Sequence, residues 1–181
     1  MSLKTHKTAV VLIPPEELFE PIQVLRREHD RHFERWMPHI TLVYPFRPRD
    51  EFDMVRPALR DACKSIAPFE LRLARFRNFR HGKGSFTLWL APEPTDAVVR
   101  LQATLESVLP DCNDASRHAA GFTPHLSVGQ IRGSDKIGHV QEDLQASWKP
   151  LAFRAEKISL IWRNERPDDI FRVGCLIELG P

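Results

Sequence analysis

The chain has 181 residues, of which 42% are hydrophobic and 28% charged, and its formal net charge is +2. These values are ordinary for a soluble globular protein, and the small net charge excludes the general basic field of a non-specific nucleic-acid binder. The three cysteines are too few and too scattered for a disulfide framework or a zinc site, which favours a reducing compartment.

The first predicted element is a buried strand at 8–13, an apolar run that ends at Pro14 and Pro15. This run is too short for a signal-peptide core or a membrane span, so we expect a cytoplasmic protein that does not contact membranes. A helix is expected at 16–31 from the spacing of its apolar residues, and a strand at 39–44 follows it.

The remaining elements are predicted from helical spacing or from strand alternation. In chain order they are a helix at 50–66, a strand at 69–79, a turn at 81–84, a strand at 85–90, a helix at 95–109, a polar loop at 110–121, a strand at 122–131, a helix at 136–148, and strands at 151–162 and 171–179. Strand–helix–strand units thus recur on both sides of a central hairpin. We therefore expect a single α+β domain over residues 1–181, with two lobes of antiparallel sheet around one cleft.

Two short segments repeat the same pattern. They read Pro-His-apolar-hydroxyl-apolar over 38–42 and 124–128, and His125 follows His39 by 86 positions. Because side chains alternate along a strand, His39 and Thr41 project from one face, and His125 and Ser127 do the same in the second segment. Each segment therefore offers one imidazole and one hydroxyl to a shared surface.

This set of groups matches the needs of phosphate ester cleavage without a metal. One imidazole can accept a proton while the other donates one, because histidine titrates near neutral pH. With a 2′,3′-cyclic phosphate, one histidine would deprotonate the attacking water or ribose hydroxyl and the other would protonate the departing ribose oxygen. Thr41 and Ser127 would hold the non-bridging oxygens. The spacing does not assign which of His39 and His125 is the acid.

The two motifs resemble those of the two-histidine (2H) phosphoesterase superfamily, which includes the bacterial 2′-5′ RNA ligase (LigT-like) proteins and cyclic nucleotide phosphodiesterases. That family is marked by two His-x-Thr/Ser motifs, which stand here at 39–41 and 125–127. The resemblance implies a bilobal α+β fold with a central cleft, metal-independent chemistry without a cofactor, and RNA ends or cyclic nucleotides as substrates. It also implies His125 as the base and His39 as the acid.

Three further residues are candidates for substrate binding. Tyr44 and Phe46 lie just past the first motif, where a base or ribose could stack, although aromatic residues at a strand end commonly belong to the core. Arg132 occupies the equivalent place after the second motif. Strict alternation puts Gly129 and Ile131 on the histidine side and Arg132 on the other, unless the strand bends.

Other polar residues are weaker candidates. Lys83 lies in a turn that could present backbone N–H groups to phosphate, but a plain hairpin turn explains it as well. Arg163 could reach the cleft from the end of a late strand or lie in solvent. His29 and His32 lack a third metal ligand nearby, so we expect them to be solvated and we expect no metal site.

Two rival functions stay open at this point. One is a non-catalytic nucleotide- or RNA-binding module that keeps the cleft without turnover. The other is a metal-dependent hydrolase that uses the same histidines as ligands, although no carboxylate lies within the motifs. We expect the protein to act as a monomer on RNA ends or small cyclic nucleotides.

Overall fold

The structure is a computed structural model that describes residues 3–117 and 121–181. Within these residues, eight strands form one sheet in the order β6-β3-β4-β5-β2-β1-β7-β8, and every neighbouring pair is antiparallel. The strands are β1 (Thr8–Leu12), β2 (Ile40–Val43), β3 (Phe69–His81), β4 (Ser85–Glu93), β5 (Leu126–Arg132), β6 (Leu151–Ala155), β7 (Lys157–Trp162) and β8 (Arg172–Glu178).

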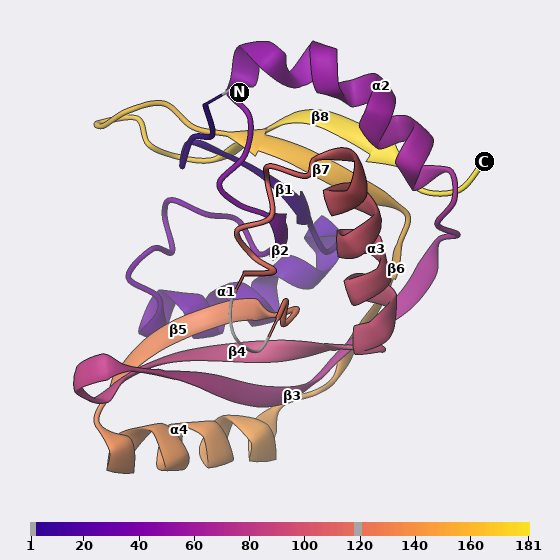
Figure 1. The fold of residues 1–181 in the computed structure, drawn as a ribbon. Coiled ribbons are helices and arrows are strands. Elements are labelled where there is room, and N and C mark those ends of the chain that lie inside the picture. The colour runs from indigo at the N-terminus through magenta and orange to yellow at the C-terminus, as the bar shows by residue number, and fades with distance from the viewer. Residues whose placement is uncertain (1–2, 118–120) are drawn as a thin grey trace.

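Four α-helices and three short 3₁₀ turns complete the described part of the chain. They are α1 (Phe19–His29), α2 (Phe52–Cys63), α3 (Thr95–Val108) and α4 (Ser134–Ser147), with η1 (Glu16–Leu18), η2 (Arg49–Glu51) and η3 (Gly82–Gly84). Figure 1 shows α2 on the outer side of β7 and β8 at the top and α4 on the outer side of β3 and β4 at the bottom. None of the described helices is long and apolar enough to span a membrane.

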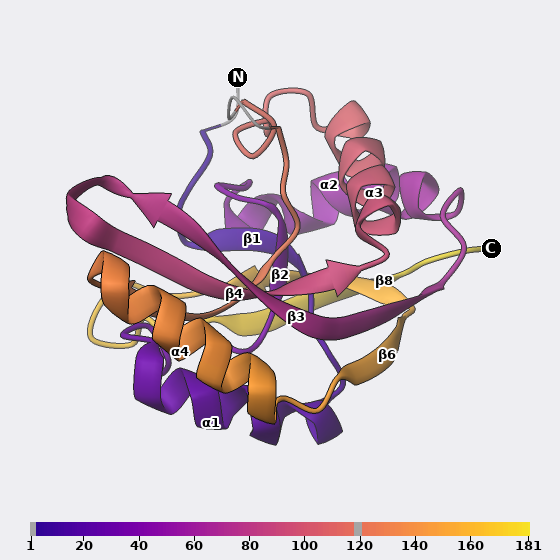
Figure 2. The ribbon, with the colours of Figure 1, turned by 90° about the horizontal axis from the view of Figure 1, so that it is seen from below.

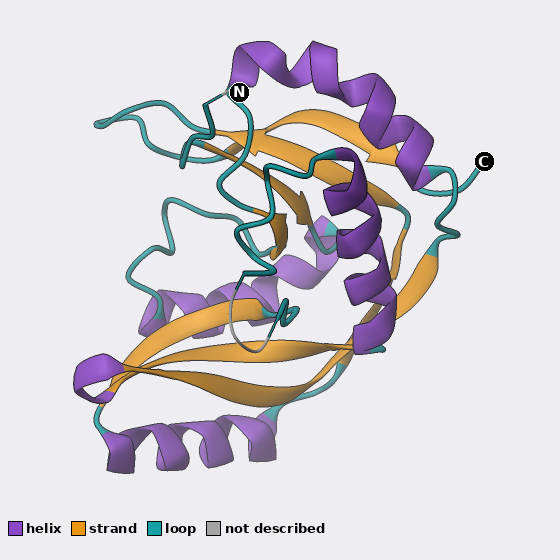
Figure 3. Ribbon diagram, viewed as in Figure 1, coloured by secondary structure: helices purple, strands orange, loops and turns teal. Residues whose placement is uncertain are grey.

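The strands curl, and three of the segments that connect them lie together at one end of the sheet. The loop between α1 and β2, the loop between β7 and β8 and the turn between β3 and β4 all lie at the left of Figure 3. In Figure 2 the same three segments again share one end of the molecule, while α1 and α4 lie on one side of the strands and α2 and α3 on the other. The expected α+β class and the antiparallel sheet are confirmed.

The core explains why these elements form. One large apolar cluster joins residues of all four helices to the inner positions of the sheet, for example Leu12, Ile22, Leu59, Leu101 and Ile137. A second, smaller cluster contains Ala9, Val11, Ile161 and Phe171. All five residues of β1 are buried because its two faces contact different clusters. Burial of this apolar area is the main stabilising contribution to the fold.

One expected strand is in fact two. The segment 151–162 splits at Glu156 into β6, which pairs with β3, and β7, which pairs with β1. Because β6 and β7 lie in different halves of the sheet, one straight strand could not make both pairings. The alternating buried positions also shift by one residue there. Phe153 and Ala155 are buried before Glu156, and Ile158 and Leu160 are buried after it.

The sheet consists of two four-stranded halves that meet between β5 and β2. The halves are β6-β3-β4-β5 and β2-β1-β7-β8, and Ile40 of β2 pairs with Leu126 of β5 at the seam. These residues belong to the two repeated motifs. The fold therefore brings together segments that are far apart in sequence.

Candidate active site

The two motifs lie side by side at the seam of the sheet. Since Ile40 is opposite Leu126, antiparallel pairing places Thr41 beside His125 and Ser127 beside His39. All four polar side chains project to the side opposite the fully buried Ile40 and Leu126. We call this side of the sheet the histidine face. The motif residues predicted to share a surface therefore come from paired strands.

Both imidazole rings are held in the same way. His39 Nδ1–H donates to the carbonyl of Met37 at 2.7 Å, and His125 Nδ1–H donates to the carbonyl of Thr123 at 2.9 Å. A carbonyl oxygen can only accept, so each ring carries its proton on Nδ1 when neutral. Each Nε2 is then left with a lone pair for a ligand.

Burial keeps both histidines neutral in the ligand-free protein. It lowers the pKa of His39 to about 4; the hydrogen bond to Met37 opposes this shift, and the charge of Arg26 adds to it. Burial also lowers the pKa of His125, partly offset by its hydrogen bond to Thr123. An anion bound between the rings would raise both pKa values again, because it favours the protonated forms.

Aromatic side chains fix each ring from the side. Trp36 stacks on His39 with ring centroids 4.6 Å apart and planes at 16°. Phe79 meets the His125 ring edge-on at 5.0 Å, and Trp89 meets it at 5.9 Å. The motifs gave no sign of these residues.

Phe171, in the loop just before β8, supports the first histidine from within the same half of the sheet. Its ring stacks on Trp36 at 3.7 Å, and it belongs to the smaller apolar cluster with Val11, which pairs with Thr41. Val11, on the histidine face of β1, thus packs in the same apolar cluster as Phe171 and Trp36. The position of His39 depends on this packing as well as on its own strand.

The two motif hydroxyls are available for a ligand. Thr41 and Ser127 are each partly exposed, and neither side chain hydrogen-bonds to another residue in the described part of the chain. A hydroxyl beside each imidazole can donate to an oxygen of a bound anion. The arrangement therefore provides two proton-transfer groups and two donors on one surface.

A buried carboxylate organises the loop that precedes His39. Asp30 accepts hydrogen bonds from Arg26 Nε at 2.9 Å, from the backbone N–H of His32 at 2.9 Å and from Gln130 Nε2 at 3.1 Å. Gln130 also accepts from the backbone N–H of Arg31 at 3.2 Å. These bonds tie the α1–β2 loop to β5, so the segments that hold the two histidines are fastened to each other.

β5 contains a bulge directly after the second motif. Ser127 lies opposite Trp89, whereas Gly129 lies opposite Leu88, so Val128 is an extra residue in the ladder. An extra residue shifts the alternation by one position and turns every later side chain to the other face.

The bulge brings Arg132 to the histidine face. Arg132 lies opposite Ser85, which shares its side of β4 with Trp89, the neighbour of His125. Ile131 is instead buried in the core with 4% of its surface exposed. The expectation that Ile131 would share the histidine side is therefore wrong, because alternation cannot foresee a bulge.

The two aromatic candidates after the first motif separate. Tyr44 lies near the site: its ring meets Trp36 edge-on at 5.7 Å and His6 at 5.2 Å. Phe46 is completely buried and packs against Phe52 at 5.8 Å in the main core. The structure corrects the placement of Phe46, which has no exposed surface to offer a substrate.

The structure also shows where the weaker candidates lie. Lys83 lies exposed in the hairpin turn, with a left-handed φ of 61°. The Arg163 guanidinium lies 5.6 Å from the ring of Phe171, at the edge of the site. His29 is not solvated as expected: its side chain is 12% exposed, because it packs against Gly129 of β5.

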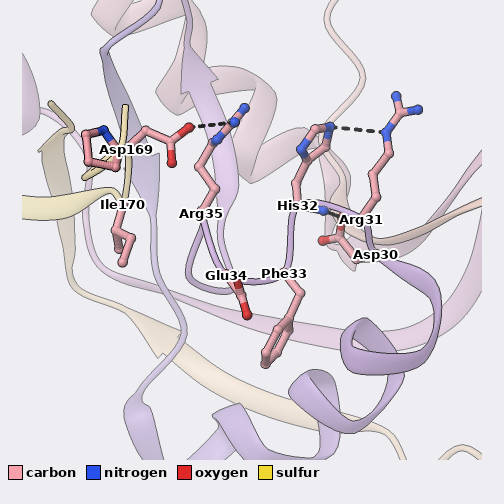
Figure 4. Close-up of a pocket in the computed structure, with 9 residues that line it drawn as sticks. Asp30, Arg31, His32, Phe33, Glu34, Arg35, Asp169 and Ile170 are labelled. Carbon is pink, nitrogen blue, oxygen red and sulfur yellow. Dashed lines mark hydrogen bonds and ion pairs between the residues drawn. The ribbon is translucent and has the colours of Figure 1, made fainter. Parts of the chain in front are cut away.

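A cavity of about 410 Å³ opens next to the site, between the α1–β2 and β7–β8 loops. Figure 4 shows Arg31, His32 and Arg35 pointing to the same side of it. Arg35 forms an ion pair of 2.6 Å with Asp169, and Arg31 Nε donates to His32 Nε2 at 3.2 Å. The four motif residues do not line this cavity.

The donor set at the site does not favour a metal ion. Among residues 3–117 and 121–181, no three His, Cys, Asp or Glu side chains are grouped so that they could hold one. The motif pair supplies two imidazoles and two hydroxyls, and the neighbouring carboxylate of Asp30 is already engaged by three donors. The groups on the histidine face are thus two imidazoles and two hydroxyls.

The chain is similar to known proteins over most of its length. The family model described as "2′-5′ RNA ligase superfamily" matches residues 14–167. A protein of Geobacillus kaustophilus, provisionally named a phosphoesterase, is 29% identical over 160 residues, which cover 88% of this chain and 89% of that protein. A similarly named protein of Bacillus licheniformis is 28% identical over 135 residues, covering 74% and 76%.

Solved structures share the fold. The Thermus thermophilus protein TT0787 superposes with a TM-score of 0.64 at 20% identity, covering 96% of this chain and 97% of its own. Escherichia coli LigT in complex with 3′-AMP superposes with a TM-score of 0.63 at 16% identity, covering 97% and 99%. At these identities the likeness establishes the bilobal fold alone.

Proposed function

The chain belongs to the 2′-5′ RNA ligase superfamily of two-histidine phosphoesterases, and we propose that it hydrolyses 2′,3′-cyclic phosphates or related 2′-5′ phosphodiesters at RNA ends or in small cyclic nucleotides. The same groups could run the reverse reaction and join 2′-5′ linkages. Hydrolysis is the direction we propose.

One observation carries the proposal. His39 and His125 directly precede two paired strands, and both use Nδ1 to bind a backbone carbonyl, so that both Nε2 atoms are free for proton transfer on one face. Histidines that only stabilised the fold would have no need of this matched orientation. A pair that works on a single phosphorus requires it.

In the proposed reaction, His125 acts as the base and His39 as the acid. His125 Nε2 takes a proton from water as the water oxygen attacks phosphorus. The bond between phosphorus and one ribose oxygen breaks, and His39 Nε2–H gives its proton to that oxygen. The product is a phosphomonoester on one ribose hydroxyl beside a free hydroxyl. Each of these proton transfers typically contributes 10²–10⁴-fold in rate.

The acid role sets a condition on His39. With a pKa of about 4 in the ligand-free protein, His39 is deprotonated at neutral pH. It becomes a proton donor when the negative charge of the bound phosphate raises its pKa. Binding of the substrate phosphate therefore favours the protonated, acid form of His39.

Thr41 and Ser127 have a separate role in the proposal. Their hydroxyls donate to the two non-bridging oxygens, where negative charge increases as water adds to phosphorus. Tyr44 and Arg132 lie at the borders of the site and are proposed to bind the rest of the substrate. We propose that the protein works without a metal, as a cytoplasmic monomer.

A substrate panel tests the proposal. The purified protein is assayed in EDTA with 2′,3′-cyclic mononucleotides, ADP-ribose cyclic phosphate and 2′-5′ linked dinucleotides. We expect turnover of at least one class, with the activity unchanged by the chelator. Activity abolished by EDTA and restored by a divalent metal would favour a metal-dependent hydrolase. Tight binding without turnover of any of them would favour a non-catalytic binding module.

A further inference from the structure

The histidine face continues across β5, β4 and β3, beyond the two motifs. We call the part formed by these strands the hairpin face. Phe79 lies on it, since its ring contacts both His125 and Trp89, the latter at 4.8 Å. Arg77 is opposite Trp89, and Arg132 is opposite Ser85 on the same side.

Two arginines on this face are not neutralised. Arg77 and Arg132 are exposed, and within residues 3–117 and 121–181 neither forms an ion pair or a hydrogen bond. Several other exposed arginines do form ion pairs, such as Arg100 with Asp96 and Arg154 with Glu70. An unpaired guanidinium on the histidine face is available to bind phosphate.

The distances are too great for a mononucleotide. Arg132 follows His125 by seven positions, which corresponds to about 20 Å along a strand. Arg77 lies two strands away from Ser127, about 10 Å across the sheet. A ligand whose phosphate sits between the histidines reaches both arginines only if it carries further negative charges at regular intervals.

Aromatic rings accompany these charges. Phe79 is partly exposed, and its ring contacts both Trp89 and His125, two positions along β3 from Arg77. Single-stranded nucleic acids are bound by this combination, in which cationic groups follow the phosphates and aromatic rings stack on bases. A cyclic phosphate end requires ribose, so the matching polymer is RNA.

We infer that the hairpin face binds the single-stranded RNA leading to the reacting phosphate, with Arg77 and Arg132 on backbone phosphates and Phe79 under a base. This inference rests on the proposed phosphodiesterase function. It identifies the preferred substrate as an oligonucleotide end and not a free cyclic mononucleotide.

The test compares kcat/KM for a cyclic mononucleotide with kcat/KM for an oligoribonucleotide of six residues ending in 2′,3′-cyclic phosphate. We expect the wild-type protein to prefer the hexamer by tenfold or more. Arg77→Gln and Arg132→Gln each lower this preference, by about tenfold for one lost charged contact. Each substitution also makes the salt dependence of hexamer cleavage shallower, by about 0.7 in the log–log slope.

Arg80→Gln is the matched control. Arg80 is exposed on the same strand, but it lies opposite Phe86 on the other side of the sheet. Its substitution leaves the hexamer preference unchanged. Equal kcat/KM for the two substrates in the wild-type protein, or equal effects of Arg77→Gln and Arg80→Gln, would overturn the inference.

A binding measurement separates this inference from the proposed function. If neither a 2′,3′-cyclic phosphate nor a 2′-5′ phosphodiester is cleaved, the proposed function fails. Fluorescence anisotropy with a labelled hexamer ending in 3′-phosphate then still tests the face. Weaker binding by the Arg77→Gln/Arg132→Gln double variant than by Arg80→Gln supports the RNA surface, and equal binding refutes it.

Discussion

At the scale of single residues, the site depends on how each imidazole is surrounded. His39 lies between the carbonyl of Met37 and the indole of Trp36, and His125 between the carbonyl of Thr123 and the rings of Phe79 and Trp89. A carbonyl fixes the tautomer of each ring, and the aromatic contacts limit its rotation. Burial lowers the pKa of both histidines, although each carbonyl hydrogen bond partly offsets it, so site geometry and stability are linked.

This linkage predicts how stability depends on pH. The pKa of His39 is about 4 in the folded chain, against about 6.5 for an unfolded histidine. Between these values the unfolded chain binds more protons, so the free energy of unfolding rises with pH. Titration of His39 therefore leaves the free energy of unfolding at its full value above pH 6.5. It lowers this free energy by on the order of 2–3 kcal/mol as the pH falls from 6.5 towards 4.

Urea unfolding at pH 4.5 and pH 7.5 measures this effect. The stability difference between the two pH values is expected to shrink in His39→Gln, which removes the titrating group. His139→Gln, at an exposed position, serves as the control and keeps the wild-type difference. If His39→Gln showed the full wild-type pH dependence, burial of His39 could not be its source.

The motif residues could be predicted because their pattern occurs twice with the same alternation. Trp36, Phe79 and Trp89 could not, because the register between strands decides which aromatic side chain meets which histidine. Phe46 shows the limit of proximity in sequence. It stands only two positions after Tyr44, yet it is completely buried in the core.

At the scale of elements, the close packing of α1 on β5 positions the two motifs. At Gly129 a Cβ atom would lie 2.4 Å from the Cβ of His29 and 2.9 Å from its carbonyl oxygen. The helix can approach the strand only because Gly129 has no side chain. The hydrogen bonds of Gln130 to Asp30 and Arg31 follow directly after this contact.

Gly129→Ala is therefore expected to push α1 away from β5 and to destabilise the fold by about 1–3 kcal/mol. The control is Gly138→Ala in the interior of α4, where a Cβ atom would meet nothing within 4 Å. That change is expected to stabilise the helix by roughly 0.5–1 kcal/mol. Urea midpoints of the two variants provide the comparison. A Gly129→Ala protein as stable as Gly138→Ala would contradict the proposed packing.

Most elements could be predicted from apolar spacing, since helices and strands bury residues at different periods. Two of the features that escaped are local breaks in alternation. β5 gains Val128 as an extra residue, and the segment 151–162 changes its buried side at Glu156. The second break was visible in the sequence, whereas the first depends on pairing with β4.

At the scale of the whole molecule, the halves of the sheet meet where chemistry is proposed to occur. Each half carries one motif, and the pair Ile40–Leu126 joins them. Repetition of strand–helix–strand units predicted the two halves. It could not give the strand order, because β6 and β7 are consecutive in the chain but lie in different halves.

The roles of the two histidines can be separated by the leaving group. A 4-nitrophenyl phosphodiester releases a stable anion, so its cleavage needs a base more than an acid. His39→Ala is expected to regain much of its lost activity on this substrate, whereas His125→Ala is not. The opposite result would exchange the two roles and leave the pair itself in place.

The most direct measurement of the joint action of both halves is kcat/KM on the best cyclic phosphate of the panel, in EDTA, for the wild-type protein, His39→Ala and His125→Ala. Each substitution is expected to reduce kcat/KM by at least about 100-fold, because each removes one proton transfer from the same reaction. Circular dichroism checks that both variants are folded. Full activity in either folded variant would contradict the claim that the two imidazoles act together on one phosphorus.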